Sequence, residues 1–299
     1  MADSSKGQGK KFLITAGACL GLGMFPSSVA GAETKPAAPA PLLSFAEHVA
    51  QLKKTVPRGF SVVEQPPFVV IGDEWPATLQ RRASNTVQWA VDLLKKDFFQ
   101  LAPSEPIDIW LFKDNESYRK YARQIFNETP STPNGYSRPQ ERRLVVNVSN
   151  GNGVLVHEIM HPLMRANFPA CPPWFNEGLA SLFESSREVD GHIRGETNQR
   201  LPGLQEAIRL GRVPSLSALL GASDAEFHGK NESLYYAQAR YLCFHLQERG
   251  ALANFYREFA SNVSLDPTGA TALKKVLAED NLAAFQKKWE ASVLALKYP

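Results

Sequence analysis

Two histidines four positions apart, His157 and His161, constrain this chain more than any other feature of its sequence. On an α-helix, positions i and i+4 lie on one face about one turn apart, so both imidazoles can reach a single metal ion. Glu158 follows the first histidine and would lie beside that ion, where a general base for a metal-activated water has to be. The pattern H-E-x-x-H therefore predicts a metal site carried by a helix, provided that the surrounding sequence supports it.

The segment downstream of the second histidine supplies a third ligand. A catalytic zinc site usually has three protein ligands and leaves a fourth position for water. Residues 172–184 begin with two prolines and continue with helical spacing, and Glu177 lies 16 positions beyond His161. That interval lets one helix end and a second return antiparallel with its carboxylate facing the ion. We therefore predict one Zn²⁺, bound by His157, His161 and Glu177.

Together the two segments resemble the gluzincin metallopeptidases, in which H-E-x-x-H is completed by N-E-G-x-A. Here the second motif is Asn-Glu-Gly-Leu-Ala at residues 176–180, and its distance from the first is similar to that in the compact peptidase MA-like branch. The likeness covers about residues 60–295, but its specific motifs occupy only 153–184 and one later helix. It implies that the three predicted ligands bind zinc and that Glu158 is the general base.

The later helix is expected over residues 234–246. It resembles the family helix whose leading tyrosine hydrogen-bonds the oxyanion of the tetrahedral intermediate. Alignment on the apolar positions places Tyr236 at the position of this leading tyrosine, and Tyr235 is the second choice. The alternative for Tyr236 is an aromatic residue of the core. One donor at a developing oxyanion contributes on the order of a few kcal/mol.

The resemblance implies hydrolysis of peptide bonds by a metal-activated water, with Glu158 passing the proton to the departing amine. Asn176 and Glu184 are candidates to orient the ligands, since Glu184 lies two helical turns beyond Glu177. The absence of the G-x-M-E-N segment used by aminopeptidase members favours an endopeptidase. The alternative is a non-hydrolytic zinc-containing module that binds peptides or proteins. Glu158 argues against that module, because a structural site needs no base.

The first 32 residues predict a secretory signal peptide. Three lysines precede an apolar run over residues 12–25, and small residues follow it, with cleavage expected near Ala30 or Ala32. The run is shorter than the roughly 20 residues needed to cross a bilayer, so no stable membrane span is expected. The protein is therefore predicted to be exported, either periplasmic or secreted.

The charge balance does not suggest a nucleic-acid partner. Of 33 basic and 30 acidic side chains, three lysines and Asp3 fall in the predicted signal peptide, so 30 and 29 remain. A nucleic-acid-binding face would need a clustered excess of Lys and Arg. The predicted partner is a peptide or protein substrate, and the sequence predicts no oligomeric state.

Alternating strand-like and helix-like runs predict an α+β fold, with a small mixed sheet before the motif helix and helices after it. The expected parts are a signal peptide at 1–32, a proline-rich tether and short helix at 33–59, an α/β subdomain with the zinc site at 60–185, and a helical subdomain at 186–299. Strands are expected at 68–72, 107–112, 135–137 and 143–148. One of them should border the metal cleft.

Pro162 follows His161 directly and cannot donate to the carbonyl of Glu158, so the helix is expected to kink or become irregular there. The two cysteines outside the predicted signal peptide leave two possibilities open. Cys171 and Cys243 either form a disulfide or are small buried apolar residues.

Three further histidines are expected to have mainly structural roles, and no role is assigned to His48. His192 and His228 are expected on solvated loops, where either could also line the cleft as an auxiliary donor, and His245 is expected to pack within a helix.

Overall fold

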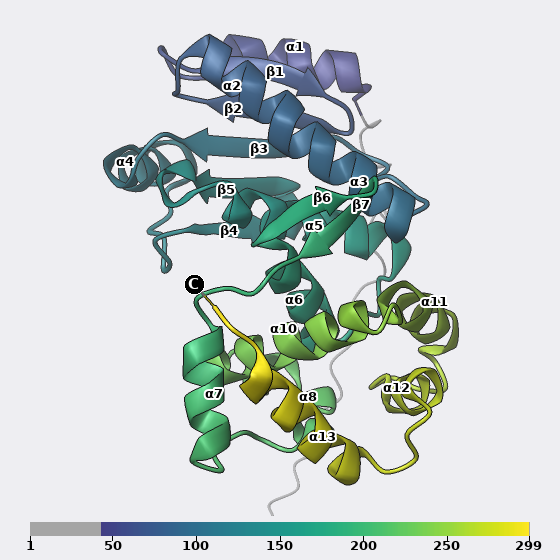
Figure 1. Ribbon diagram of the computed structural model, residues 1–299. Helices are drawn as coiled ribbons and strands as arrows, with labels where there is room; N and C mark the ends of the chain where they lie inside the picture. The colour runs from purple at the N-terminus through teal and green to yellow at the C-terminus, as the bar shows by residue number, and fades with distance from the viewer. Residues whose placement is uncertain (1–42, 299) are drawn as a thin grey trace, which may run out of the picture. The chain divides into compact units, whose positions relative to one another are not determined.

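The computed structural model describes residues 43–298, and the predicted signal peptide and tether lie outside this range. The described residues form an α+β fold with a five-stranded mixed sheet in the N-terminal half and a mainly helical C-terminal half (Figure 1). The predicted fold class is confirmed. Within residues 43–298, no helix has the length and apolar character needed to cross a membrane.

The N-terminal half builds the sheet and the helices that cover it. Its elements are α1 (Phe45–Thr55), β1 (Ser61–Gln65), β2 (Phe68–Gly72), α2 (Pro76–Arg82), the π-helix η1 (Ala83–Gln88), α3 (Trp89–Asp97), β3 (Ile107–Phe112), α4 (Asn115–Phe126), β4 (Gly135–Arg138), η2 (Pro139–Glu141), β5 (Arg143–Asn147) and η3 (Val148–Asn150). The strand order is β1-β2-β3-β5-β4, with β2, β3 and β5 parallel and both edge strands antiparallel to their neighbours. All four predicted strands form.

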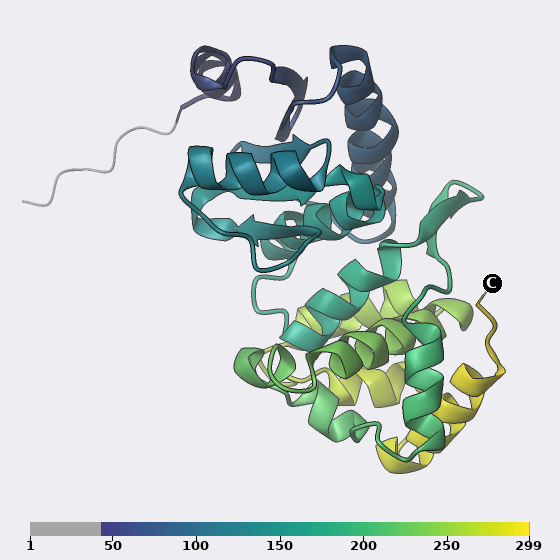
Figure 2. The ribbon, with the colours of Figure 1, turned by 90° about the vertical axis from the view of Figure 1, so that its left-hand side faces the viewer.

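The central strands are buried on both faces, which explains their continuous apolar sequences. Successive side chains of a strand point to opposite faces, so β2 contributes Phe68 and Val70 to the larger core and Val69 and Ile71 to the smaller one. Helices α1 and α4 complete the smaller core. The larger core continues from the sheet into the C-terminal helices, which stack below the sheet in Figure 2.

The C-terminal half begins with the two helices that carry the motifs. Its elements are α5 (Gly153–Asn167), α6 (Pro173–Phe183), β6 (Ser186–Val189), β7 (His192–Gly195), α7 (Leu201–Arg209), α8 (Leu216–Leu220), α9 (Asp224–Phe227), α10 (Glu232–Glu248), α11 (Leu252–Asn262), α12 (Ala270–Leu277) and α13 (Leu282–Ala295). The hairpin β6–β7 was not predicted. Its signal is the pair Asp190-Gly191, whose φ angles of 53° and 75° suit a two-residue hairpin turn.

Of the two outcomes expected at Pro162, a kink or an irregular segment, helix α5 rules out the second. The helix continues from Gly153 to Asn167 with the proline inside it, so no irregular segment forms beyond the second histidine. A proline in a helix interior costs about 3 kcal/mol. Leu163 and Met164 follow it and are 0% and 2% exposed, and their burial in the larger core offsets that cost.

Helices α6 and α10 approach each other closely at Gly178, the glycine of the N-E-G-x-A motif. A Cβ at this position would lie 2.9 Å from the carbonyl oxygen of Ala239 and 3.1 Å from its Cβ. The neighbouring atoms belong mainly to backbone, which cannot move aside without moving α10. The glycine therefore sets the distance between the helix that carries Glu177 and the helix that carries Tyr236.

Gly178→Ala is expected to lower the free energy of unfolding by about 1–3 kcal/mol, because the added methyl group overpacks the α6–α10 contact. Gly203→Ala is the matched control, since Gly203 lies in helix α7 and a methyl group there would meet no neighbouring atom within 4 Å. The control should gain about 0.5–1 kcal/mol. Urea unfolding of the three proteins measures both values, and equal stability of Gly178→Ala and the wild type would contradict the packing argument.

Candidate metal centre

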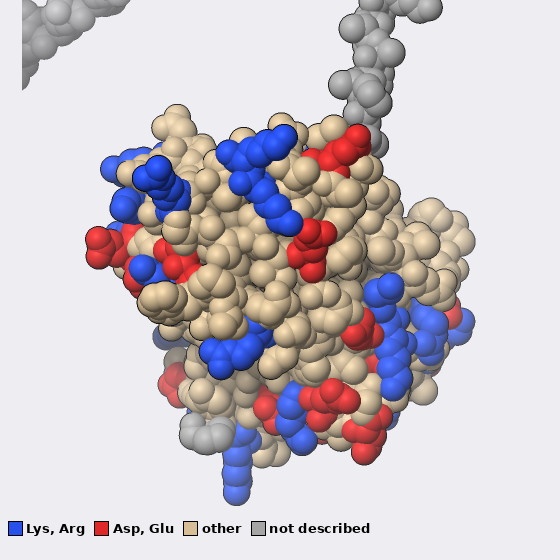
Figure 3. Space-filling view, turned by 90° about the horizontal axis from the view of Figure 1, so that it is seen from above, with Lys and Arg blue, Asp and Glu red and all other residues tan. Residues whose placement is uncertain are grey.

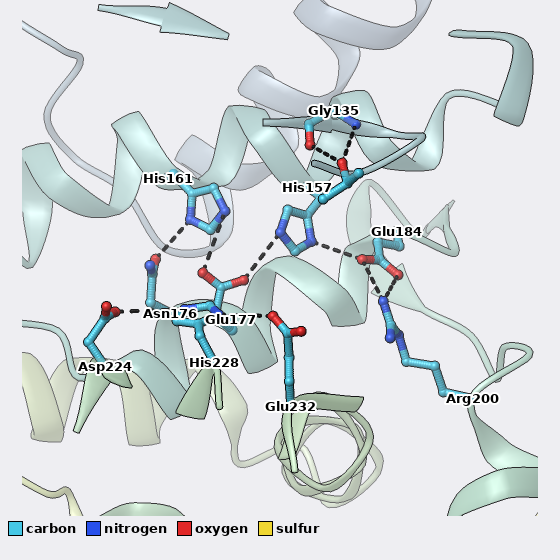
Figure 4. A network of polar contacts seen from close by, with 11 residues as sticks. Gly135, His157, His161, Asn176, Glu177, Glu184, Arg200, Asp224, His228 and Glu232 are labelled. Atoms are coloured by element: carbon cyan, nitrogen blue, oxygen red, sulfur yellow. Dashed lines mark hydrogen bonds and ion pairs between the residues drawn. The ribbon is translucent and has the colours of Figure 1, made fainter. Parts of the chain in front are cut away.

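The predicted ligands come together where α5 and α6 face each other (Figure 4). His157, His161 and Glu177 each offer one ligand atom, and these three atoms lie within 4.8 Å of one another. Nε2 of His157 is 3.3 Å from Oε2 of Glu177, and Nε2 of His161 is 3.8 Å from Oε1. The antiparallel return of the second helix, predicted from the interval between the motifs, therefore brings the carboxylate to both imidazoles.

The three side chains fit a zinc ion. Two imidazoles and one carboxylate are a donor set of catalytic zinc sites, and ligands at about 2.0–2.1 Å from a tetrahedral ion lie roughly 3.3 Å apart. Glu177 is 8% exposed, and its Oε2 accepts no hydrogen bond from any residue within 43–298. A buried carboxylate needs a cation or a hydrogen-bond donor to offset its lost hydration. A metal ion between these atoms meets that need.

The carboxylate is held in the ionised form that a ligand requires. Burial alone would raise the pKa of Glu177, but the imidazoles of His161 and His157, together with the hydroxyl of Tyr236, outweigh it and bring the pKa to about 2. Glu177 therefore stays negatively charged across the physiological pH range.

Polar side chains fix the far nitrogen of each ligand imidazole. Nδ1 of His161 lies 3.2 Å from Oδ1 of Asn176. Nδ1 of His157 lies 2.9 Å from Oε1 of Glu184, close enough for an ion pair although the N–H is not aligned for a hydrogen bond. Such partners leave Nε2 of each ring free to face a metal ion bound between the rings and Glu177. The two residues that the sequence suggested as orienting groups are thus in contact with the ligands.

Glu158 lies on α5 beside the ligands and is 7% exposed. Its carboxylate forms no ion pair and no hydrogen bond with the residues that the structure describes. Burial raises the pKa of Glu158, and the imidazoles of His157 and His161 only partly counter this effect. A carboxyl group whose pKa is raised toward neutrality can both accept and return a proton.

Tyr236, and not Tyr235, neighbours the candidate metal ligands. Burial, followed by the carboxylate of Glu177, raises the pKa of Tyr236 well above its ordinary value, so its hydroxyl stays protonated. Tyr235 instead stacks on Phe227, with ring centroids 5.7 Å apart and planes inclined by 11°. The helical register inferred from the apolar positions is the one that brings Tyr236 to Glu177.

Two further polar residues lie near Tyr236. The guanidinium of Arg200 is 5.3 Å from its ring centroid, and the imidazole of His228 is 5.9 Å from it. His228 follows α9 directly and lies between the carboxylates of Asp224 and Glu232, at 3.7 and 3.3 Å (Figure 4). The sequence predicted His228 on a solvated loop from which it could also line the cleft, and His228 is exposed at the end of α9. Arg200 was not predicted, because it belongs to no local motif.

The other histidines and the cysteines lie outside the centre. His192 is 57% exposed and pairs with Asp97, and His245 of α10 packs against Phe285 of α13. Cys171 and Cys243 are free thiols, with Cys243 buried. The disulfide is therefore absent from this structure. Burial raises the pKa of the Cys243 thiol, as expected for a small apolar residue in the core.

The edge strand β4 borders the centre. Among residues 43–298 it pairs with β5 alone, and its first residue, Gly135, packs against α5, because a Cβ at Gly135 would lie 3.2 Å from the side chain of Val154. The unpaired backbone groups of an edge strand are able to pair with another extended chain. On the face shown in Figure 3, basic side chains are interspersed with acidic ones and form no continuous basic surface.

Comparison with models of protein families gives no match to this sequence, and comparison with curated proteins gives none either. The likeness to gluzincins consequently rests on the two motifs and on the geometry that joins them.

The wild-type protein is expected to retain one zinc ion per chain after dialysis, and the single variants His157→Ala, His161→Ala and Glu177→Ala are expected to lose it. Each variant removes one of the three donors that a catalytic zinc site uses. Elemental analysis measures the metal content. His192→Ala is the control, because its exposed imidazole lies elsewhere and the variant should keep the ion. Unchanged zinc in Glu177→Ala would refute the ligand assignment.

Proposed function

We propose that this chain is an exported zinc-dependent peptidase of the gluzincin type. The observation that carries the proposal concerns Glu158. This buried carboxylate has no hydrogen bond or ion pair in the described part of the chain, and it lies next to a His-His-Glu cluster that fits zinc. A purely structural zinc site has no use for such a group, because its ligands alone complete the coordination. Export rests on the predicted signal peptide at residues 1–32.

A zinc ion bound by His157, His161 and Glu177 supplies Lewis acidity, which polarises a carbonyl group and lowers the pKa of water. Glu158 accepts the proton of the attacking water and holds it within the buried site. Because burial raises the pKa of this carboxyl group, it can then donate the same proton to the departing amine. The amine would otherwise leave as an unstable anion.

Tyr236 acts on the carbonyl oxygen of the bond that is cleaved. Its phenol stays protonated beside the carboxylate of Glu177, so it can donate a hydrogen bond to the oxygen on which negative charge develops. Helix α10 holds this side chain through the close contact at Gly178. The donor is therefore positioned before the substrate arrives.

The substrate is a peptide in an extended conformation. Strand β4 packs against α5, the helix that carries His157, and its outer edge pairs with no other described strand. An extended peptide can pair with such an edge through main-chain hydrogen bonds. Main-chain pairing is independent of the peptide's termini. Together with the absence of a G-x-M-E-N segment, this favours cleavage within a chain over removal of a terminal residue.

Glu158→Gln is expected to keep stoichiometric zinc and to lower the turnover of a cleavable peptide by about 10²–10⁴-fold, because it removes proton transfer without removing a ligand. The measurement is cleavage of a peptide library analysed by mass spectrometry, with metal content determined on the same samples. If both proteins bind zinc and neither cleaves any peptide in the library, the site belongs to a non-hydrolytic binding module.

Tyr236→Phe is expected to lower kcat by about 10²–10³-fold with little change in KM, since the lost hydrogen bond forms mainly in the transition state. Tyr235→Phe is the control, because that ring stacks on Phe227 and its hydroxyl is not needed there. Steady-state kinetics on one peptide measure both variants. A larger loss in Tyr235→Phe than in Tyr236→Phe would reverse the assignment.

A further inference from the structure

Arg200 lies immediately before α7, where contacts of its backbone hold it in place. Its N–H donates to Oδ1 of Asn198 at 3.1 Å. Asn198 is 2% exposed, and its own N–H donates to the hydroxyl of Tyr241 on α10 at 3.0 Å. The path of the chain at Arg200 is therefore fixed by buried groups that do not involve the guanidinium.

The guanidinium of Arg200 contacts two side chains of the candidate centre at once. Its Nη2 lies 3.4 and 3.5 Å from the two carboxylate oxygens of Glu184 (Figure 4). Its Cζ lies 5.3 Å from the ring centroid of Tyr236, within the range of a cation–π contact. The side chain is 28% exposed, so water screens these contacts less than it would on an open surface.

Each of these two contacts leads to a different zinc ligand. Glu184 lies 2.9 Å from Nδ1 of His157, and Tyr236 neighbours the carboxylate of Glu177. One planar cation thus touches the group that orients an imidazole ligand and the ring that carries the proposed oxyanion donor. A lysine ammonium is a compact point charge, so it is less able than the extended planar guanidinium to contact a carboxylate and lie over an aromatic ring at the same time.

We propose that Arg200 is a positioning residue that holds Glu184 and the ring of Tyr236 together, and so links the orientation of the ligand His157 to that of the phenol donor. The proposal rests on the proposed function for the role of Tyr236. Its other half, the support of His157 through Glu184, concerns metal affinity alone.

The test compares Arg200→Met and Arg200→Lys with the wild type in zinc affinity, kcat and KM. Arg200→Met removes both contacts, so its zinc affinity should fall about 10–100-fold, as when an outer partner of a metal ligand is lost. Its kcat should fall as well. Arg200→Lys keeps a positive charge for Glu184 but not the planar contact with Tyr236. It should stay within about threefold of wild-type zinc affinity while kcat falls about tenfold, with KM unchanged.

Competition with a chelator measures zinc affinity, and thermal unfolding of the metal-free proteins monitors the fold. The matched control is Arg209→Met at the other end of α7, whose exposed side chain pairs only with Glu206 at 3.7 Å among the residues described. It should match the wild type in every measurement.

Wild-type zinc affinity and kcat in Arg200→Met would overturn the proposal. So would equal losses in both Arg200 variants accompanied by a fall in unfolding temperature, because these would indicate a role in folding only. If the wild type binds zinc but cleaves no peptide, the proposed function fails. The zinc affinity of Arg200→Met then still decides whether Arg200 supports His157 through Glu184.

Discussion

The burial of one carboxylate, that of Glu177, is the constraint on which the arrangement of α5, α6 and α10 depends. A charge removed from water is tolerated only when polar partners surround it. Helix α5 provides two imidazoles on one side, α10 provides the phenol of Tyr236, and Gly178 lets α10 come close enough to do so. The same partners leave a place for a cation between the imidazoles and the carboxylate.

Polar contacts around that carboxylate also fix the orientation of the neighbouring side chains. Asn176 and Glu184 hold the far nitrogens of the two imidazoles, and Arg200 connects Glu184 with Tyr236. Ligands whose orientation is fixed in advance lose less entropy when they bind a metal or a substrate. Glu158 is the exception, because it lies among these groups without a fixed partner in the described chain. That freedom suits the proton transfer that we propose for this carboxyl group.

The sequence predicted the parts of this structure that depend on local spacing. The i, i+4 histidines and the apolar runs of the sheet follow from helix and strand periodicity. The interval to Glu177 follows from the length that one helix end, a loop and a returning helix need. Features that depend on tertiary packing were not predictable. The helix through Pro162 persists because neighbouring side chains are buried, and Arg200 reaches the centre only because the β6–β7 hairpin and Asn198 lead the chain back to α10. The sequence also left open whether Cys171 and Cys243 form a disulfide, and the structure shows both as free thiols.

A crystal structure of the zinc-loaded protein, with anomalous diffraction recorded on both sides of the zinc absorption edge, tests the central claim most directly. We expect one strong anomalous peak about 2.0–2.2 Å from Nε2 of His157, Nε2 of His161 and a carboxylate oxygen of Glu177, with no fourth protein ligand. A peak at another site, or a fourth protein side chain closing the coordination, would contradict an open catalytic zinc centre.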